Sequence, residues 1–333
     1  MHPDRDTTRS VRPRQGGPVG TLVEELLAGR GRHVDGRIPT GLEPLDTLLA
    51  GGMRPGDLTV LGGRPAVGKT ALALTIAAAA AADGVAVTYA CLEHDPGELV
   101  ERLLLARVAA GGDGRGSLPP AAQTRALLAS VLAGATPWSR AVAQVPQLEA
   151  AQEWLTALGD HLTLVCGAHL DLDAIVASMP NGGRRRLLVV DYLQKLTRDP
   201  SDVHAEEAAR DCKGLALDTG AAVLAISATD HEGLRVPRVR LAHLRGSATL
   251  AYESDLVLVL EDKLQAVSRR HTAFDGTKAR QYRDRSVVVL EKHRRGMDGV
   301  AFELRRSLAY SWFDPAGSVV AEELAEPESV SIG

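Results

Sequence analysis

The stretch DLTVLGGRPAVGKTALALTIAAAAAA, residues 57–82, holds the pattern G-x-x-x-x-G-K-T between an apolar segment and an alanine-rich one. A strand, a glycine-rich turn and a helix in this order are typical of a phosphate-binding loop and argue against an accidental turn. In such a loop, backbone N–H groups and the positive end of the helix face the phosphates. The residues that we predict to bind the nucleotide are Gly63, Arg64, Pro65, Ala66, Val67, Gly68, Lys69, Thr70 and Ala71.

Four side chains could carry the chemistry. Lys69 is expected to reach the β- and γ-phosphates of ATP, and Thr70 to ligate Mg²⁺. Phosphoryl transfer with magnesium also needs a carboxylate at the end of a neighbouring strand, and Asp191 ends the apolar segment LLVVD. A helix N-cap or turn aspartate is the alternative. Glu93 follows the apolar segment VAVTYACL and is our candidate for activating water, with a surface glutamate as an equal alternative.

The composition of the 333 residues, with 45% hydrophobic, 24% charged and 3% aromatic, is typical of a globular protein with one main domain. The chain has no apolar run near the roughly 18 residues that span a bilayer, and its N-terminus lacks the apolar block of a signal peptide. We therefore expect a cytoplasmic protein that does not bind membranes. We expect three buried thiols at Cys91, Cys166 and Cys212, which form no C-x-x-C pair. The net charge of −4 means that nucleic-acid binding would need a local basic surface such as residues 278–306.

Apolar strands alternate with helical segments, which predicts an α/β fold with a mostly parallel sheet covered on both faces. The predicted strands are 57–61, 85–91, 162–166, 186–191 and 221–227. Residues 111–160 are interpreted as a helical excursion between two strands. Beyond residue 250 we expect helices to stop and an antiparallel extension to follow, with strands at 255–260, 286–291 and 300–304.

The ends of the chain differ in composition from the body. Residues 1–19 are predicted to be a disordered tail, and residues 316–333 an acidic one. Residues 20–38 contain a short amphipathic helix and a connector, so the main domain covers 39–315. Thr40 and Glu43 have the spacing of a capping box, which predicts a short helix before Gly51-Gly52.

Several motifs, in this order, resemble the ATPase domain of the DnaB-type replicative helicases over about residues 20–315. They are TGLEPLDTLLAGG, the phosphate loop, CLEHDPGELVERLL, LLVVDYLQ, LRGSATLAYESDLVLVL and EKHRRG. RadA-like and KaiC-like ATPases share the entry motif but not usually DYLQ. The resemblance implies a RecA-like fold, ATP and Mg²⁺ as cofactors, and a ring hexamer in which the helix at 20–30 grips a neighbouring subunit.

The resemblance also implies roles for individual residues. Glu93 would be the general base, and Asp191 would bind the magnesium ion. Lys292 and Arg294, in EKHRRG, would reach the γ-phosphate held by the neighbouring subunit, which makes hydrolysis depend on assembly. From the residues alone, a solvated basic hairpin is the preferred interpretation of this run, because charge runs are usually surface.

Single-stranded DNA is the partner that the resemblance implies, and its contact turn reads LRGSA here. Arg245 and Gly246 would meet the strand backbone in a sequence-independent, salt-sensitive way. Arg235, Arg238 and Arg240 precede this turn and are further candidates, with solvated loop arginines as the alternative.

The departures from the family matter too. A glutamine that senses the γ-phosphate in the family is Ala228 here, with Thr229 or His231 as candidate substitutes. The family's N-terminal helical domain has no counterpart in residues 1–19. We therefore expect a stand-alone, ATP-hydrolysing ring motor on single-stranded DNA. The alternatives are an ATP-gated assembly module that acts on protein partners and, ranked lower, a small-molecule kinase.

Overall fold

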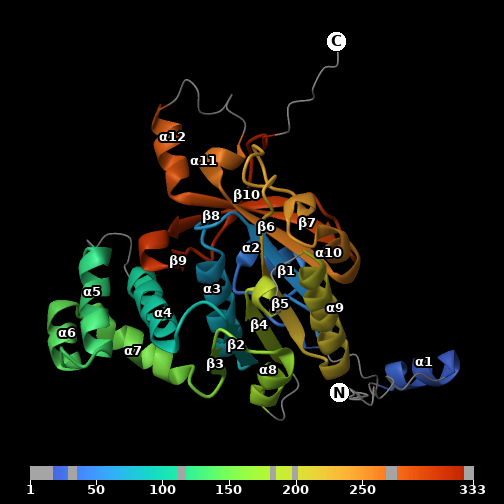
Figure 1. The fold of residues 1–333 in the computed structure, drawn as a ribbon, viewed down its shortest axis with the longest axis horizontal. Helices are drawn as coiled ribbons and strands as arrows, with labels where there is room; N and C mark the ends of the chain where they lie inside the picture. Colours follow the sequence, from blue (N-terminus) through green and yellow to red (C-terminus); the bar gives the residue numbers. More distant parts are fainter. Residues whose placement is uncertain are drawn as a thin grey trace, which may run out of the picture.

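The computed structural model describes residues 18–28, 36–111, 118–180, 185–196, 202–267 and 276–325. Its centre is a ten-stranded sheet in the order β10-β8-β7-β6-β1-β5-β4-β2-β3, with β9 beside β8 (Figure 1). The strands are β1 (Leu58–Gly63), β2 (Ala86–Cys91), β3 (Leu162–Cys166), β4 (Arg186–Asp191), β5 (Ala222–Ala228), β6 (Leu256–Asp262), β7 (Arg285–His293), β8 (Ala301–Ser307), β9 (Trp312–Phe313) and β10 (Ser318–Val319). The α/β prediction and the five N-terminal strands are confirmed.

Helices cover both faces of this sheet (Figure 1). They are α2 (Glu43–Leu48), α3 (Lys69–Ala82), α4 (Pro96–Gly111), α8 (Leu172–Ser178), α9 (Asp202–Thr219), α10 (Ser247–Glu253), α11 (Lys263–Ala266) and α12 (Gly276–Arg283). The predicted excursion holds α5 (Ala121–Leu132), α6 (Trp138–Gln144) and α7 (Gln147–Ala157), and the N-terminal amphipathic segment is α1 (Val19–Leu27).

Alternate residues of the central strands serve different cores. In β5, Leu224 and Ile226 belong to the core beneath α3, whereas Val223 and Ala225 belong to the core beneath α9. Because both faces are buried, these strands are apolar at most positions, which is why they were recognisable in the sequence. Strand β6 differs from the prediction: it pairs in parallel with β1, so the antiparallel part starts only at β7.

Three further expectations were wrong. Helices do not stop at residue 250, since α11 and α12 lie between β6 and β7. The capping box is absent, because Thr40 donates from its N–H (2.8 Å) and its hydroxyl (2.7 Å) to Asp46 instead. Cys166 is only half-buried, since β3 is the outer strand of the sheet, whereas Cys91 and Cys212 are buried as expected.

The predicted acidic tail begins later than residue 316. Strand β10 pairs with β8, and Glu322 accepts hydrogen bonds from Lys263 (2.9 Å) and Tyr282 (2.7 Å). These contacts hold the chain to the body as far as residue 325. The remainder of that tail, residues 326–333, and most of the predicted N-terminal one, residues 1–17, lie outside the described residues.

Candidate active site

The loop between β1 and α3 has the backbone of a phosphate cradle. Gly68 precedes the first residue of α3 with φ +107°, and a Cβ there would lie 2.7 Å from Leu308 Cδ2 and 3.0 Å from Phe313 Cζ. At Gly63, with φ +150°, a Cβ would lie 2.4 Å from the carbonyl oxygen of Leu260. Both glycines are therefore required by the backbone and its close neighbours, as the loop pattern predicts.

Lys69 is the first residue of α3 and points back into the loop. Its ammonium donates to the carbonyls of Gly63 (2.8 Å) and Arg64 (2.9 Å). Burial lowers the pKa of Lys69 to about 8, although the carboxylates of Asp191 and Glu93 act in the opposite direction. A bound phosphate would replace these carbonyls as the partner of the ammonium and would favour its charged form.

Asp191 lies at the carboxyl end of β4 and is almost fully buried, with 1% of its surface exposed. Burial raises the pKa of Asp191, while hydrogen bonds from Tyr89 (2.8 Å) and Thr70 lower it. The carboxylate therefore lies against the hydroxyl of Thr70. Two neighbouring hard oxygen donors next to a phosphate cradle are a donor set that suits Mg²⁺.

Glu93 comes two residues after β2, and its side chain is about one-third exposed. Its carboxylate lies 3.4 Å from the ammonium of Lys195. A cavity of about 400 Å³ brings Glu93 together with Lys69, Thr70 and Asp191, although they come from three separate segments. This arrangement places a carboxylate and a candidate metal site in one solvent-accessible space, as hydrolysis requires.

The sequence analysis missed Tyr192 and Ile226, which adjoin predicted segments of the cavity, and four further lining residues. His94 and Arg102 follow Glu93 on the same side, with their ring and guanidinium nitrogens 3.5 Å apart. Leu308 and Ser311 come from the segment between β8 and β9. The first pair lies within the quoted motif CLEHDPGELVER and could have been found there, whereas no local pattern marks the second pair.

Lys292 and Arg294 lie at the opposite edge of the sheet from the phosphate loop. Strand β6 runs parallel to β1, and its first residue, Leu256, is paired with His293 of β7. The end of β7 is therefore beside the start of β1, whereas the loop follows the end of β1. The structure separates these two cations from the cavity of their own chain by the length of the strand.

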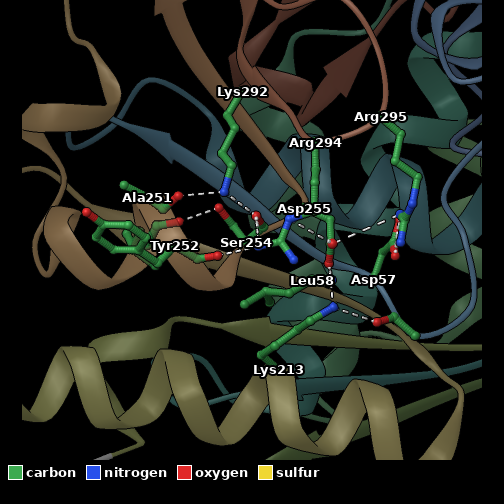
Figure 2. A network of polar contacts seen from close by, with 12 residues as sticks. Asp57, Leu58, Lys213, Ala251, Tyr252, Ser254, Asp255, Lys292, Arg294 and Arg295 are labelled. Carbon is green, nitrogen blue, oxygen red and sulfur yellow. Dashed lines mark hydrogen bonds and ion pairs between the residues drawn. The ribbon is translucent and has the colours of Figure 1, made fainter.

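Both cations are held by the carboxyl end of α10 (Figure 2). Lys292 donates to the carbonyls of Ala251 (2.6 Å) and Ser254 (2.5 Å), and Arg294 donates to those of Tyr252 and Ser254. Burial, followed by the charge of Arg294, lowers the pKa of Lys292. Cations at the end of a helix interact favourably with its dipole, so these contacts define where the two side chains rest.

Asp255 organises the same edge (Figure 2). Its Oδ2 accepts hydrogen bonds from the ammonium of Lys213 (2.6 Å) and the N–H of Leu58 (2.9 Å). Arg294 Nε lies 3.5 Å from Oδ1 of the same carboxylate. One buried anion thus joins the starts of β1 and β6 to α9 and to the basic end of β7.

The comparison with protein families agrees with this geometry, since residues 37–313 match the family described as DnaB-like helicase C terminal domain. The chain belongs to this DnaB-like family. It is 25% identical to the replicative DNA helicase DnaB of Leifsonia xyli over 292 residues, which are 84% of this chain and 56% of that protein. It is also 35% identical to the DNA repair protein RadA of Mycobacterium tuberculosis, over 31% of this chain and 20% of that protein. The chain thus spans about half, or less, of the length of these relatives.

Two solved structures share the fold of this DnaB-like chain. One is an isolated ATPase domain, which aligns over 90% of this chain and 99% of its own, with a TM-score of 0.67 and 22% identity. The other is a DnaB-like replicative helicase, studied with its interactions with primase, which aligns over 90% of this chain and 68% of its own, with a TM-score of 0.64 and 20% identity. Among the described helices, none combines the length and apolar character needed to cross a membrane.

The turn that was predicted to contact single-stranded DNA lies beside the end of β5. The N–H of Arg245 donates to the carbonyl of Ala228 (3.0 Å), and Gly246, with φ +73°, precedes α10. Arg245 is half-exposed and Arg235 is exposed, so both can be reached from solvent.

The structure gives the two remaining arginines of this loop different surroundings. Arg238 is buried, with its guanidinium 2.9 Å from Glu291 and 4.0 Å from Glu261. These ion pairs leave 5% of the Arg238 side chain exposed, so it offers little surface for the DNA contact predicted for it. Arg240 is half-exposed and lies 3.5 Å from Glu291.

The position of the missing DnaB-like sensor glutamine lies in the wall of the cavity. Ala228 lines it, and the backbone N–H of Ala228 donates to the side chain of Gln194 (3.3 Å), which belongs to the motif DYLQ. Neither suggested substitute lines the cavity: Thr229 is buried, with no hydrogen bond to its hydroxyl among the described residues, and His231 is exposed to solvent.

Proposed function

We propose that this chain is an ATP-hydrolysing motor that assembles head to tail into a ring and binds single-stranded DNA. The observation that carries the proposal is the placement of the phosphate loop and of Lys292 and Arg294 at opposite edges of one sheet. A chain with these two halves of a site can complete it only with a neighbouring copy. Repetition of such a heterologous contact produces a ring when the rotation closes.

Within each site the residues have distinct tasks. The loop and Lys69 bind the phosphates, and Mg²⁺ held by Thr70 and Asp191 would neutralise charge on them. Glu93 orients water and accepts its proton. Lys292 and Arg294 of the adjacent subunit stabilise the negative charge that develops on the transferred group. Hydrolysis in this arrangement depends on assembly, since no single chain brings its loop and these two cations together.

The third part of the proposal is the contact with single-stranded DNA. Arg245 and Gly246 meet the sugar-phosphate backbone, with Arg235 and Arg240 nearby. Contacts of this kind bind without sequence preference and weaken as salt rises, because each arginine that pairs with a phosphate displaces a counterion.

A second candidate is an assembly module that oligomerises on ATP and acts on protein partners. The alanine at position 228 favours it, since this side chain lines the cavity but cannot form the hydrogen bond of the family's glutamine. Such a module would hydrolyse ATP at a rate that single-stranded DNA does not change.

The deciding experiment is ATP turnover by the full chain with and without single-stranded oligothymidine, at low and high salt. We expect stimulation by the strand that falls as salt rises and that is lost in Glu93→Gln, which retains nucleotide binding. Glu149→Gln is a matched control, because Glu149 is exposed and lies outside the cavity. Turnover that is indifferent to the strand refutes the motor and supports the assembly module. A phosphorylated metabolite in place of free phosphate would revive the kinase alternative.

A further inference from the structure

Arg64, the second residue of the phosphate loop, does not line the nucleotide cavity. Its guanidinium contacts the segment that follows β5, where Nε donates to the carbonyl of Gly233 (3.1 Å) and Nη2 to that of Val236. Its third contact is Glu261 of β6, with Nη1 3.4 Å from Oε1. The phosphate loop is thus bound through one side chain to a segment about 170 residues away.

Glu261 is a buried carboxylate that contacts both Arg64 and the segment to which Arg64 is bound. Its side chain has no exposed surface, and Oε1 also accepts the N–H of Val239 (2.7 Å). Oε2 accepts no hydrogen bond among the described residues and lies 4.0 Å from Arg238 Nε. Burial raises the pKa of Glu261 to about 7, so the energy of this carboxylate depends on how its cationic neighbours are placed.

The segment held by Arg64 is continuous with the proposed strand contact. Thr229 pairs with Leu244, Asp230 donates its N–H to the carbonyl of His243 (2.9 Å), and the N–H of Arg245 reaches the carbonyl of Ala228. Residues 229–245 therefore form a loop that is closed at its base. Arg64 donates hydrogen bonds to the middle of this loop, and Arg245 lies at its base.

We propose that Arg64 and Glu261 couple the nucleotide loop to residues 229–245, a task for which Ala228 has no suitable side chain. Phosphate binding repositions the backbone that carries Arg64, and the three contacts of its guanidinium transmit that shift to the loop ending at Arg245. The coupling works equally in reverse, because the effect of nucleotide on strand affinity must equal the effect of strand on nucleotide affinity. This inference rests on the proposed function, since it requires a strand to be bound.

The test is the Kd for fluorescent oligothymidine, measured by anisotropy without nucleotide and with a saturating non-hydrolysable ATP analogue. The ratio of the two constants is the coupling, and saturation removes any effect of a variant on analogue affinity. In the wild type we expect a ratio of about tenfold, within the usual range for coupled sites. In Arg64→Gln, Glu261→Gln and the double variant the ratio should fall to within about twofold of unity, because either loss breaks one shared contact.

Glu303→Gln is the matched control. Glu303 is also a buried carboxylate, paired with Lys263 and Arg285, but it contacts neither the phosphate loop nor residues 229–245. Its ratio should equal that of the wild type, and thermal unfolding shows whether each variant is folded.

Two other results would overturn the inference. A wild-type ratio that survives in all three variants refutes the coupling role and leaves the motor intact. The absence of strand binding in every protein refutes the motor and the coupling together.

Discussion

Lys69→Ala and Arg294→Ala are each expected to abolish ATP turnover, and mixtures of the two variants are expected to recover part of it. Strand β1 has six residues, which cover about 17 Å at 3.3 Å per residue. Lys69 lies beyond one end of β1, and Arg294 lies beside the other. In the proposed ring, a nucleotide bound to one subunit would therefore meet Arg294 of the neighbouring subunit, and the two defects would fall on different subunits of a mixed interface.

Random mixing determines the size of the recovery. A site works when a subunit with an intact Lys69 faces a neighbour with an intact Arg294. At equal proportions about one interface in four meets this condition, whatever the number of subunits in the ring. Turnover should therefore peak at about a quarter of the wild-type rate at equal mixing and fall towards zero at either end, if sites turn over independently.

The assay is phosphate release by oligomers in which the two variants carry different affinity tags and are purified through both. Mixing Lys69→Ala with the double variant is the control, since no interface of that mixture has both residues intact. The reasoning is refuted if doubly tagged oligomers form and yet turnover at every ratio stays at the sum of the two pure variants. That result would place both residues in sites of a single subunit.

Three more predictions concern single sites. Nucleotide affinity should fall about tenfold between pH 7 and pH 9, because the Lys69 ammonium, whose pKa is about 8, must be charged to pair with phosphate; titration calorimetry should show a flat profile for Lys69→Arg. Lys213→Met removes the hydrogen-bonded partner of buried Asp255 and should lower the free energy of unfolding by about 3 kcal/mol in urea denaturation. Gly68→Ala places a Cβ 2.7 Å from a leucine side chain at φ +107° and should weaken nucleotide binding, whereas Gly84→Ala, also at positive φ but in open space, should leave it unchanged.

The contacts at the end of α10, drawn in Figure 2, suggest how single-stranded DNA could influence ATP turnover. The seven-residue helix α10 starts after Gly246, the proposed strand contact, and its carboxyl end receives Lys292 and Arg294. One short helix thus has the proposed DNA contact at one end and, at the other, the two cations that we propose act on the neighbouring site. The mixed-oligomer assay, repeated with oligothymidine, measures whether strand and neighbour act on the same interfaces.

Local patterns predicted some elements and not others. Strands β1, β4 and β5 were recognisable because burial on both faces makes most of their residues apolar, and β3 was recognisable although it is only half-buried. The capping box failed because Thr40 has a better acceptor in Asp46, only six residues on. The acidic end was interpreted as a tail because its composition is polar, yet Glu322 has a buried cation as partner that the local sequence does not reveal. Composition describes average solvation, whereas a single ion pair depends on which chain segment lies opposite.

The sequence by itself determined the nucleotide loop and its carboxylate candidates, because a strand, a turn and a helix in immediate succession fix the position of Lys69 through local backbone geometry. Only the tertiary structure decided what the other charged residues do. It buried Arg238 in ion pairs, joined Arg64 to Glu261 across 197 residues, and separated Arg294 from the loop of its own chain. The reason is physical, because the energy of a charge depends on its burial and on its nearest partners. In this sheet, neighbouring strands are distant in the sequence, so those partners come from distant parts of the chain.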